Sequence, residues 1–214
     1  MQLTVLLDAP RARTSDEFLI RDLPGTSGRL DVVCRVLIST YRSVPRLAPF
    51  IQFYAVLGGS PNPPLQLHVN NLQVEYVPES ELACALIMKT LLFLYRTKKV
   101  SQVSPWPEFS LHPKNFEDTL KEIWPSSPQC LYLVEEGDPL DQVILDLSRP
   151  ILLILGDDKG LRSDHEAVIL QHPVQRVSMG TRSLLGSQVI SLFLLEFANR
   201  LEQDVSPQGM MPNR

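Results

Sequence analysis

The stretch that decides the fold is residues 151–160, ILLILGDDKG, in which five apolar residues run directly into a glycine-containing turn. A short apolar run that ends in this way is typical of a buried parallel strand and its following loop. Residues 177–190, VSMGTRSLLGSQVI, repeat the arrangement. Ligands gather at the carboxyl ends of strands in open α/β sheets, so we predict that Gly156 and the turn at 178–183 line one pocket. The alternative is a pair of ordinary strand-to-helix turns.

Other elements alternate along the chain around these two stretches. Apolar runs of strand length and segments of helical period predict strands at 3–7, 50–57, 131–134 and 151–155, and helices at 30–41, 79–95, 115–123 and 184–201. This alternation predicts an α/β fold with a mostly parallel sheet flanked by helices. Residues 97–114 combine serines, prolines and charges, and predict a long surface connection between two halves. Residues 204–214 predict a flexible tail.

The charges are distributed unevenly. The whole chain of 214 residues has a formal charge of −4, yet the first fifty residues carry seven arginines against five acidic residues. A net negative chain is not a general polyanion binder, so any phosphate-binding surface should be local and built from arginines. Scattered, solvated arginines are the alternative interpretation. Hydrophobic residues make up 44% of the chain and charged residues 21%, which is ordinary for a globular protein.

Several specific motifs do not occur in the sequence. The phosphate-binding pattern GxxxxGK[ST], the dinucleotide pattern GxGxxG, the zinc-protease pattern HExxH and the hydrolase pattern GxSxG are all missing. The four histidines are scattered, so we expect no metal site. The three cysteines, Cys34, Cys84 and Cys130, are widely spaced, which favours a reducing compartment. With no long apolar segment and no secretory leader, we expect a cytoplasmic protein.

Residues 22–35, DLPGTSGRLDVVCR, form a second candidate site, in which a glycine-rich loop leads into an apolar helix. Glycines allow backbone amides to approach an anion, and the helix N-terminus favours negative charge. Arg29 could bind a phosphate through two nitrogen atoms, and Asp31 could accept a proton or hydrogen bond from a base edge. The alternative is a helix-capping turn with a surface ion pair.

Four motifs together resemble the tRNA pseudouridine N1-methyltransferase family of the SPOUT superfamily. They are residues 22–35, the stretch FYAVLGGSPNPP at 53–64, the loop ILGDDKG at 154–160 and the VSMG turn at 177–180 before the last helix. The resemblance covers roughly residues 18–201. It implies a single domain over residues 1–203, an α/β fold whose C-terminal part, about 130–203, forms a trefoil knot, and a homodimer in which helix 184–201 packs against its partner.

The resemblance also implies the chemistry. The methyl donor S-adenosylmethionine (SAM) would be held mainly by main-chain groups of three loops, at Leu133, Gly156, Ser178, Met179, Gly180, Thr181, Ser183, Leu184 and Val189. The acceptor would be N1 of a pseudouridine in tRNA, of the T-loop position 54 type. The candidate catalytic residues are then Asp31, as the contact to the N1–H group, and Arg29, as the contact to an RNA phosphate. The candidate RNA-binding residues are Arg21, Arg29, Arg35 and Arg182.

The sequence departs from the family's archaeal-type pattern at three places. Asp158 stands where that pattern has histidine, residues 180–182 (Gly-Thr-Arg) replace a Ser-Pro-Leu turn, and Val189 replaces a cysteine. Two other functions stay open. One is N1-methylation of a pseudouridine in ribosomal RNA. The other is non-catalytic RNA binding, in which residues 25–28 act like the GXXG loop of a KH domain.

Overall fold

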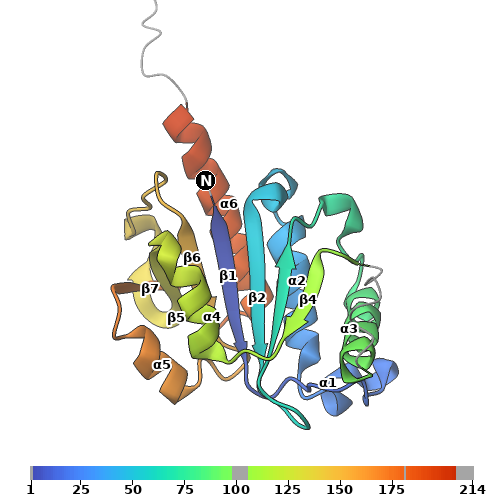
Figure 1. The fold of residues 1–214 in the computed structure, drawn as a ribbon. Helices are drawn as coiled ribbons and strands as arrows, with labels where there is room; N and C mark the ends of the chain where they lie inside the picture. Colours follow the sequence, from blue (N-terminus) through green and yellow to red (C-terminus); the bar gives the residue numbers. More distant parts are fainter. Residues whose placement is uncertain (1, 98–105, 181, 206–214) are drawn as a thin grey trace, which may run out of the picture.

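The computed structural model describes residues 2–97, 106–180 and 182–205, and within them seven strands form one sheet (Figure 1). The sheet order is β4-β3-β2-β1-β6-β5-β7. The strands are β1 (Leu3–Ala9), β2 (Ile51–Leu57), β3 (Leu65–Asn70), β4 (Phe109–His112), β5 (Gln129–Pro139), β6 (Ile151–Leu155) and β7 (Val174–Ser178). Strands β1, β2, β5, β6 and β7 pair in parallel, whereas β3 and β4 pair antiparallel. The predicted α/β class with a mostly parallel sheet is confirmed.

Helices cover both faces of this sheet (Figure 1). The α-helices are α1 (Leu23–Thr26), α2 (Leu30–Arg42), α3 (Glu81–Arg96), α4 (Phe116–Ile123), α5 (Ser163–Ile169) and α6 (Gly186–Val205). One core lies between the sheet and α2, α3 and α6, and the other between the sheet and α4 and α5. Alternate residues of β1 supply the two cores: Val5 packs into the first and Leu6 into the second.

Local sequence explains where several helices begin. The Ser80 hydroxyl accepts a hydrogen bond from the Ala83 N–H at the start of α3, and the Asn115 side chain accepts one from the Asp118 N–H at the start of α4. At α6, the Gln188 side chain reaches back to the Leu185 N–H over 2.9 Å, which is the second half of a capping box. These contacts satisfy amides that have no partner inside the helix.

The prediction of a long surface connection at 97–114 is wrong for part of the segment, and its residues 98–105 lie outside the described residues. Its residues Phe109–His112 form β4, which pairs with β3 and extends the sheet to its edge. The alternating apolar residues Phe109 and Leu111 are buried, and they pack beneath α3. The two sides of this segment therefore share one continuous sheet. In the predicted tail, α6 continues to Val205, and residues 206–214 lie outside the described residues.

Candidate active site

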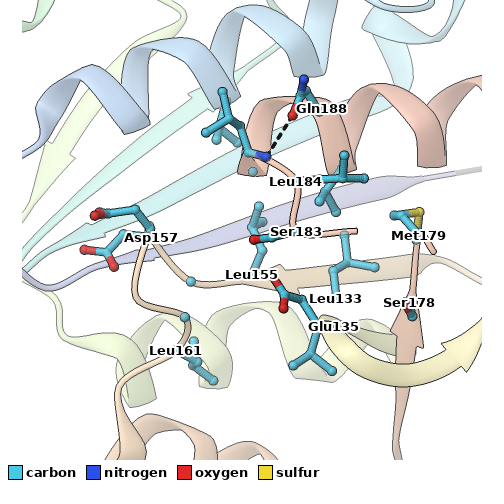
Figure 2. Close-up of a pocket in the computed structure, with 18 of the residues that line it drawn as sticks. Leu133, Glu135, Leu155, Asp157, Leu161, Ser178, Met179, Ser183, Leu184 and Gln188 are labelled. Carbon is cyan, nitrogen blue, oxygen red and sulfur yellow. Dashed lines mark hydrogen bonds between the residues drawn. The ribbon is translucent and has the colours of Figure 1, made fainter. Parts of the chain in front are cut away.

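A cavity of about 660 Å³ opens at the carboxyl ends of β5, β6 and β7 (Figure 2). Gly156 and Ser178 line it from the ends of β6 and β7, and Leu133 lines it from β5, at the point where the register of that strand shifts. The segment 182–189, which leads from β7 into α6, lines it as well, and residues of α2 close the remaining side. Figure 2 shows Leu133, Leu155 and Leu184 around the same space. The cavity therefore lies where an open parallel sheet binds its ligands.

The first loop of the cavity, residues 156–160, is a very tight turn. A Cβ at Gly156 would lie 1.9 Å from the carbonyl carbon of Gly160, so position 156 has no room for a side chain. The Asp157 carboxylate accepts the Lys159 N–H at 2.8 Å, and the Asp157 carbonyl accepts the Gly160 N–H at 3.1 Å. Gly160 has a φ of 81°, which favours glycine. This turn leaves backbone groups of Gly156 at the wall of the cavity.

Two further backbone irregularities shape the cavity. In β5 the register against β7 shifts, so that Leu133 and Asp138 both pair with Val177 and the residues between them bulge outward. Gly137 is needed there because a Cβ would lie 2.4 Å from the Val177 nitrogen. After β7, the Ser178 hydroxyl donates to the Gly180 carbonyl at 2.9 Å and accepts the Gly180 N–H at 3.2 Å. Residues of the bulge and of the turn both line the cavity.

A chain of charged groups borders the cavity. Arg29 binds the Asp31 carboxylate through Nε at 3.0 Å and Nη2 at 3.1 Å, and Arg35 binds the same carboxylate at 2.8 Å. The Asp31 side chain is only 1% exposed, so the two guanidinium groups cover it. The hydrogen bond to Asp31 raises the pKa of Arg29 above its ordinary value, which keeps this group cationic.

The charged chain continues into the loop at 156–160. Arg11, which follows β1, binds Asp157 through Nε and Nη2, each at 3.0 Å, and its Nη2 also donates to Asp158. Arg29 reaches Asp158 through its remaining nitrogen, Nη1, at 2.8 Å. Arg29 itself has a left-handed backbone, with a φ of 77°, directly after Gly28. These contacts connect the N-terminal loops to the loop after β6.

A buried histidine, His165, contacts a residue of β1 and a residue that follows the loop at 156–160. His165 of α5 contacts Asp8 of β1 through Nδ1 at 2.9 Å and Arg162 through Nε2 at 2.8 Å. Its ring stacks on Phe116 at 4.3 Å. Because Arg162 can only donate, the His165 Nε2 atom accepts and its Nδ1–H donates to Asp8. Within the described ranges no three His, Cys, Asp or Glu side chains are grouped to hold a metal ion.

Comparison with known proteins decides the family. Residues 2–200 match the model of a family described as "Putative SAM-dependent RNA methyltransferase". The chain belongs to this family. A tRNA (pseudouridine(54)-N(1))-methyltransferase of Thermococcus kodakarensis is 32% identical to this chain over 192 residues. The match covers 88% of this chain and 94% of the relative. The enzyme of the same name from Methanococcoides burtonii is 28% identical, covering 90% and 94% respectively.

One solved structure has the same fold as this chain. Archaeoglobus fulgidus Nep1 bound to S-adenosylhomocysteine aligns with a TM-score of 0.60 at 15% sequence identity, covering 94% of this chain and 99% of that one. At this identity the likeness supports the fold alone. The predicted α/β architecture is therefore confirmed, and this chain shares the fold of Nep1, whereas the trefoil knot stays a prediction.

The structure places most of the predicted cofactor residues together. Those that line the cavity of the methyltransferase are Leu133, Gly156, Ser178, Met179, Gly180, Ser183, Leu184 and Val189. Thr181 lies outside the described residues. That these residues bind a cofactor stays a prediction. Their common position follows from three strands that end at one edge of the sheet, as the sequence indicated.

Some of the predicted RNA-binding and catalytic residues line the cavity and others do not. Arg29, Arg35 and Arg182 line the cavity, whereas Arg21 is exposed on the 3-10 helix Ile20–Asp22 and is not among the lining residues. Asp31 does not line the cavity either, because Arg29 and Arg35 cover its carboxylate. The structure thus gives Asp31 contacts to these arginines, and its predicted contact with a base stays untested.

Sequence reasoning missed several residues of this site. Arg11 is 146 residues away from Asp157, and no local pattern links the two. Tyr132, Glu135 and Arg176 also line the cavity, and the Arg176 guanidinium lies 5.8 Å from the centre of the Tyr132 ring. Burial raises the pKa of Tyr132, so its phenol stays uncharged at neutral pH. Only the sheet order, which places β5 beside β7, brings these side chains together.

Ser27 and Gly28 hold the segment at 25–28 against the protein, although Gly25 is exposed. Ser27 is fully buried, its hydroxyl donates to the Leu23 carbonyl at 2.5 Å, and it accepts the Leu30 N–H at 3.0 Å. Gly28 is required because a Cβ would lie 2.0 Å from the Arg11 carbonyl oxygen. This loop therefore fixes the beginning of α2 against the loop after β1, an arrangement unlike the projecting GXXG loop of a KH domain.

Proposed function

We propose that this methyltransferase transfers the methyl group of SAM to N1 of a pseudouridine in tRNA, at the position 54 that its relatives' names give. The observation that supports this most is the cavity between the three glycine-containing strand ends, bordered by Arg29 and Arg35. When bound, SAM supplies an electrophilic methyl group on a sulfonium. Catalysis then depends mainly on positioning, because no covalent enzyme intermediate is required.

The cavity fits SAM in size and chemistry. Its volume of about 660 Å³ lies in the range of sites for ligands of this size. Leu133, Leu155 and Leu184 supply an apolar surface for the adenine ring. The tight turns at Gly156 and Gly180 bring backbone donors and acceptors to the wall, where they can bind the polar edges of the nucleoside. We propose that these residues hold the cofactor.

The charges beside the cavity suit the acceptor. N1 of pseudouridine carries a proton that must leave before or during methyl transfer. Arg29 and Arg35 place two cationic groups at the wall, and a nearby positive charge favours the anionic form of an imide. We propose that Asp31 acts through these arginines as a positioning residue, because its carboxylate binds both and is 1% exposed.

Two wider features belong to this proposal. We propose that residues 130–203 form the trefoil knot that the family resemblance implies. We also propose a homodimer through α6, whose surface carries the exposed side chains Leu192 and Leu195, 44% and 50% exposed. Exposed leucines one turn apart on a helix are suited to pack against a partner. We propose the cytoplasm as the place of the reaction, which suits a tRNA substrate.

Two tRNA transcripts that differ at one nucleotide test the function. One carries pseudouridine at position 54 and the other uridine, and both are incubated with labelled SAM. The proposal expects N1-methylpseudouridine in the first transcript, detected by mass spectrometry of the nucleosides, and no product in the second. Label in ribosomal RNA but not in tRNA would support the ribosomal alternative. RNA binding without any methyl transfer would contradict an enzymatic function.

A further inference from the structure

The Asp158 carboxylate connects two arginines from separate parts of the chain. Its Oδ1 accepts a hydrogen bond from Arg11 Nη2, and its Oδ2 accepts one from Arg29 Nη1 at 2.8 Å. The side chains of Arg11, Arg29 and Asp158 are 35%, 28% and 33% exposed. Because Arg29 and Asp158 line the cavity, this ion cluster lies at a solvent-accessible part of its wall.

The neighbouring Asp157 has a different environment. Its Oδ2 accepts two hydrogen bonds from Arg11, its Oδ1 accepts the Lys159 N–H, and its side chain is 2% exposed. Asp157 therefore holds the tight turn and the Arg11 side chain in place. Asp158, by contrast, uses its two carboxylate oxygens on two guanidinium groups at the surface. Its contacts can exchange for those of another anion without breaking the turn.

Both arginines are also held independently of Asp158. Arg29 binds Asp31 through Nε and Nη2, which directs its Nη1 toward Asp158. Arg11 binds Asp157 through Nε and Nη2. If the Asp158 carboxylate left, two cationic groups would stay at nearly the same positions. A preorganised pair of guanidinium groups is a strong binding site for a phosphate.

We propose that Arg11 and Arg29 form a phosphodiester subsite, which Asp158 occupies while no RNA is bound. A phosphodiester has one negative charge and two non-bridging oxygens, so it matches the carboxylate in charge and in acceptors. The exchange therefore leaves the charge of the cluster unchanged. This inference rests on the proposed function, because it takes the phosphate from the substrate RNA. Since Asp158 belongs to the loop at 156–160, RNA arrival would also release the two Asp158 contacts of a loop that borders the methyl-donor pocket.

The test is the dissociation constant of a tRNA transcript, measured by fluorescence anisotropy without any methyl donor. Removal of the competing carboxylate in Asp158→Ala and Asp158→Asn should tighten binding about tenfold, the effect of one charge-assisted contact. The dependence of log K on log salt should steepen by up to about 0.9, because one more counterion is released. Glu117→Gln is the matched control: it removes the same charge from an exposed position on α4.

A second substitution separates the subsite from a general charge effect. Arg11→Gln should weaken tRNA binding, and in its background Asp158→Ala should lose most of its gain. Circular dichroism and thermal unfolding establish that each variant is folded. The inference is overturned if Asp158→Ala and Asp158→Asn bind tRNA like Glu117→Gln, if their gain persists with Arg11→Gln, or if neither they nor the wild type binds tRNA.

The result of the tRNA-binding assay does not depend on whether the proposed reaction takes place. The binding assay contains no SAM and records no methylation. A protein that fails to methylate pseudouridine 54 but binds tRNA more tightly after Asp158→Ala supports the subsite and contradicts the reaction. If the protein methylates position 54 but Asp158→Ala leaves the dissociation constant of tRNA unchanged, the reaction is supported and the subsite is contradicted.

Discussion

Arg29 grips Asp31 with two nitrogen atoms, at 3.0 and 3.1 Å, and in doing so covers a carboxylate that the sequence suggested as a contact to the substrate base. The geometry is that of a bidentate arginine–carboxylate pair, which fixes orientation as well as charge. Arg35 binds the same carboxylate from the next turn of α2. Asp31 thus determines where two cationic groups stand beside the cavity.

Asp31→Asn should slow methyl transfer by about 10²-fold, the usual effect of losing one preorganised electrostatic contact. An amide cannot accept from both arginines as a carboxylate does, so Arg29 and Arg35 would lose their fixed positions. Because the substitution also removes a negative charge beside two arginines, a lower kcat/KM at every pH would show that the loss comes from their positions and not from a change in net charge. The measurement is kcat/KM against pH, with Asp16→Asn, which breaks the surface pair with Arg96, as the control. Full turnover in Asp31→Asn would remove Asp31 from the mechanism.

Two glycines with left-handed backbones should respond differently to alanine. Gly28 has a φ of 62°, and a Cβ would lie 2.0 Å from the Arg11 carbonyl oxygen, whereas Gly160 has a φ of 81° and no atom within 4 Å of the added Cβ. Gly160→Ala should therefore cost about 1–2 kcal/mol of the free energy of unfolding, from backbone strain alone. Gly28→Ala should cost clearly more. Urea unfolding measures both, and equal losses would contradict the packing described around Gly28.

Charge on the outer face of α6 tests the proposed dimer. Leu192→Glu and Leu195→Glu place carboxylates where we expect a partner helix, so sedimentation should show a shift from dimer to monomer. Leu170→Glu is the control, because this leucine is 54% exposed at the end of α5. A wild-type protein that sediments as a monomer at micromolar concentration would contradict the proposal directly.

The Cys130 thiol should be inert in the folded protein. Burial raises its pKa to about 12, so near pH 8 only about one molecule in ten thousand carries the reactive thiolate. The pKa of Cys34 is also raised, by its contact with the Cys84 thiol and by burial. Titration with a thiol reagent should therefore find the cysteines unreactive until the protein is unfolded. Rapid labelling of Cys130 in the native state would contradict its position under α4.

Much of the fold could be predicted because its elements have strong local patterns. The helix expected at 30–41 corresponds to α2, and the strand expected at 151–155 is β6. The short β3 and β4 were missed because their apolar residues alternate with polar ones over only a few positions. β4 also lies in a stretch whose serines and prolines indicate a loop.

The site was predictable in part for the same reason. Glycines after apolar strands marked Gly156 and the turn after β7, and parallel strands bring such turns to one edge. The partners of Asp157 and Asp158 were not predictable, since Arg11 follows a different strand and meets them only because β1 lies beside β6. The burial of Asp31 beneath Arg29 depends on side-chain placement that no spacing of residues reports.

Calorimetric titration with SAM tests the central claim most directly. The wild type should bind SAM and S-adenosylhomocysteine at one site per chain. Gly156→Val should abolish this binding while the protein stays folded by circular dichroism, because a side chain at position 156 collides with Gly160. A folded wild type that binds neither compound, or a Gly156→Val variant that binds both as well as the wild type does, would contradict the proposal that this cavity holds the methyl donor.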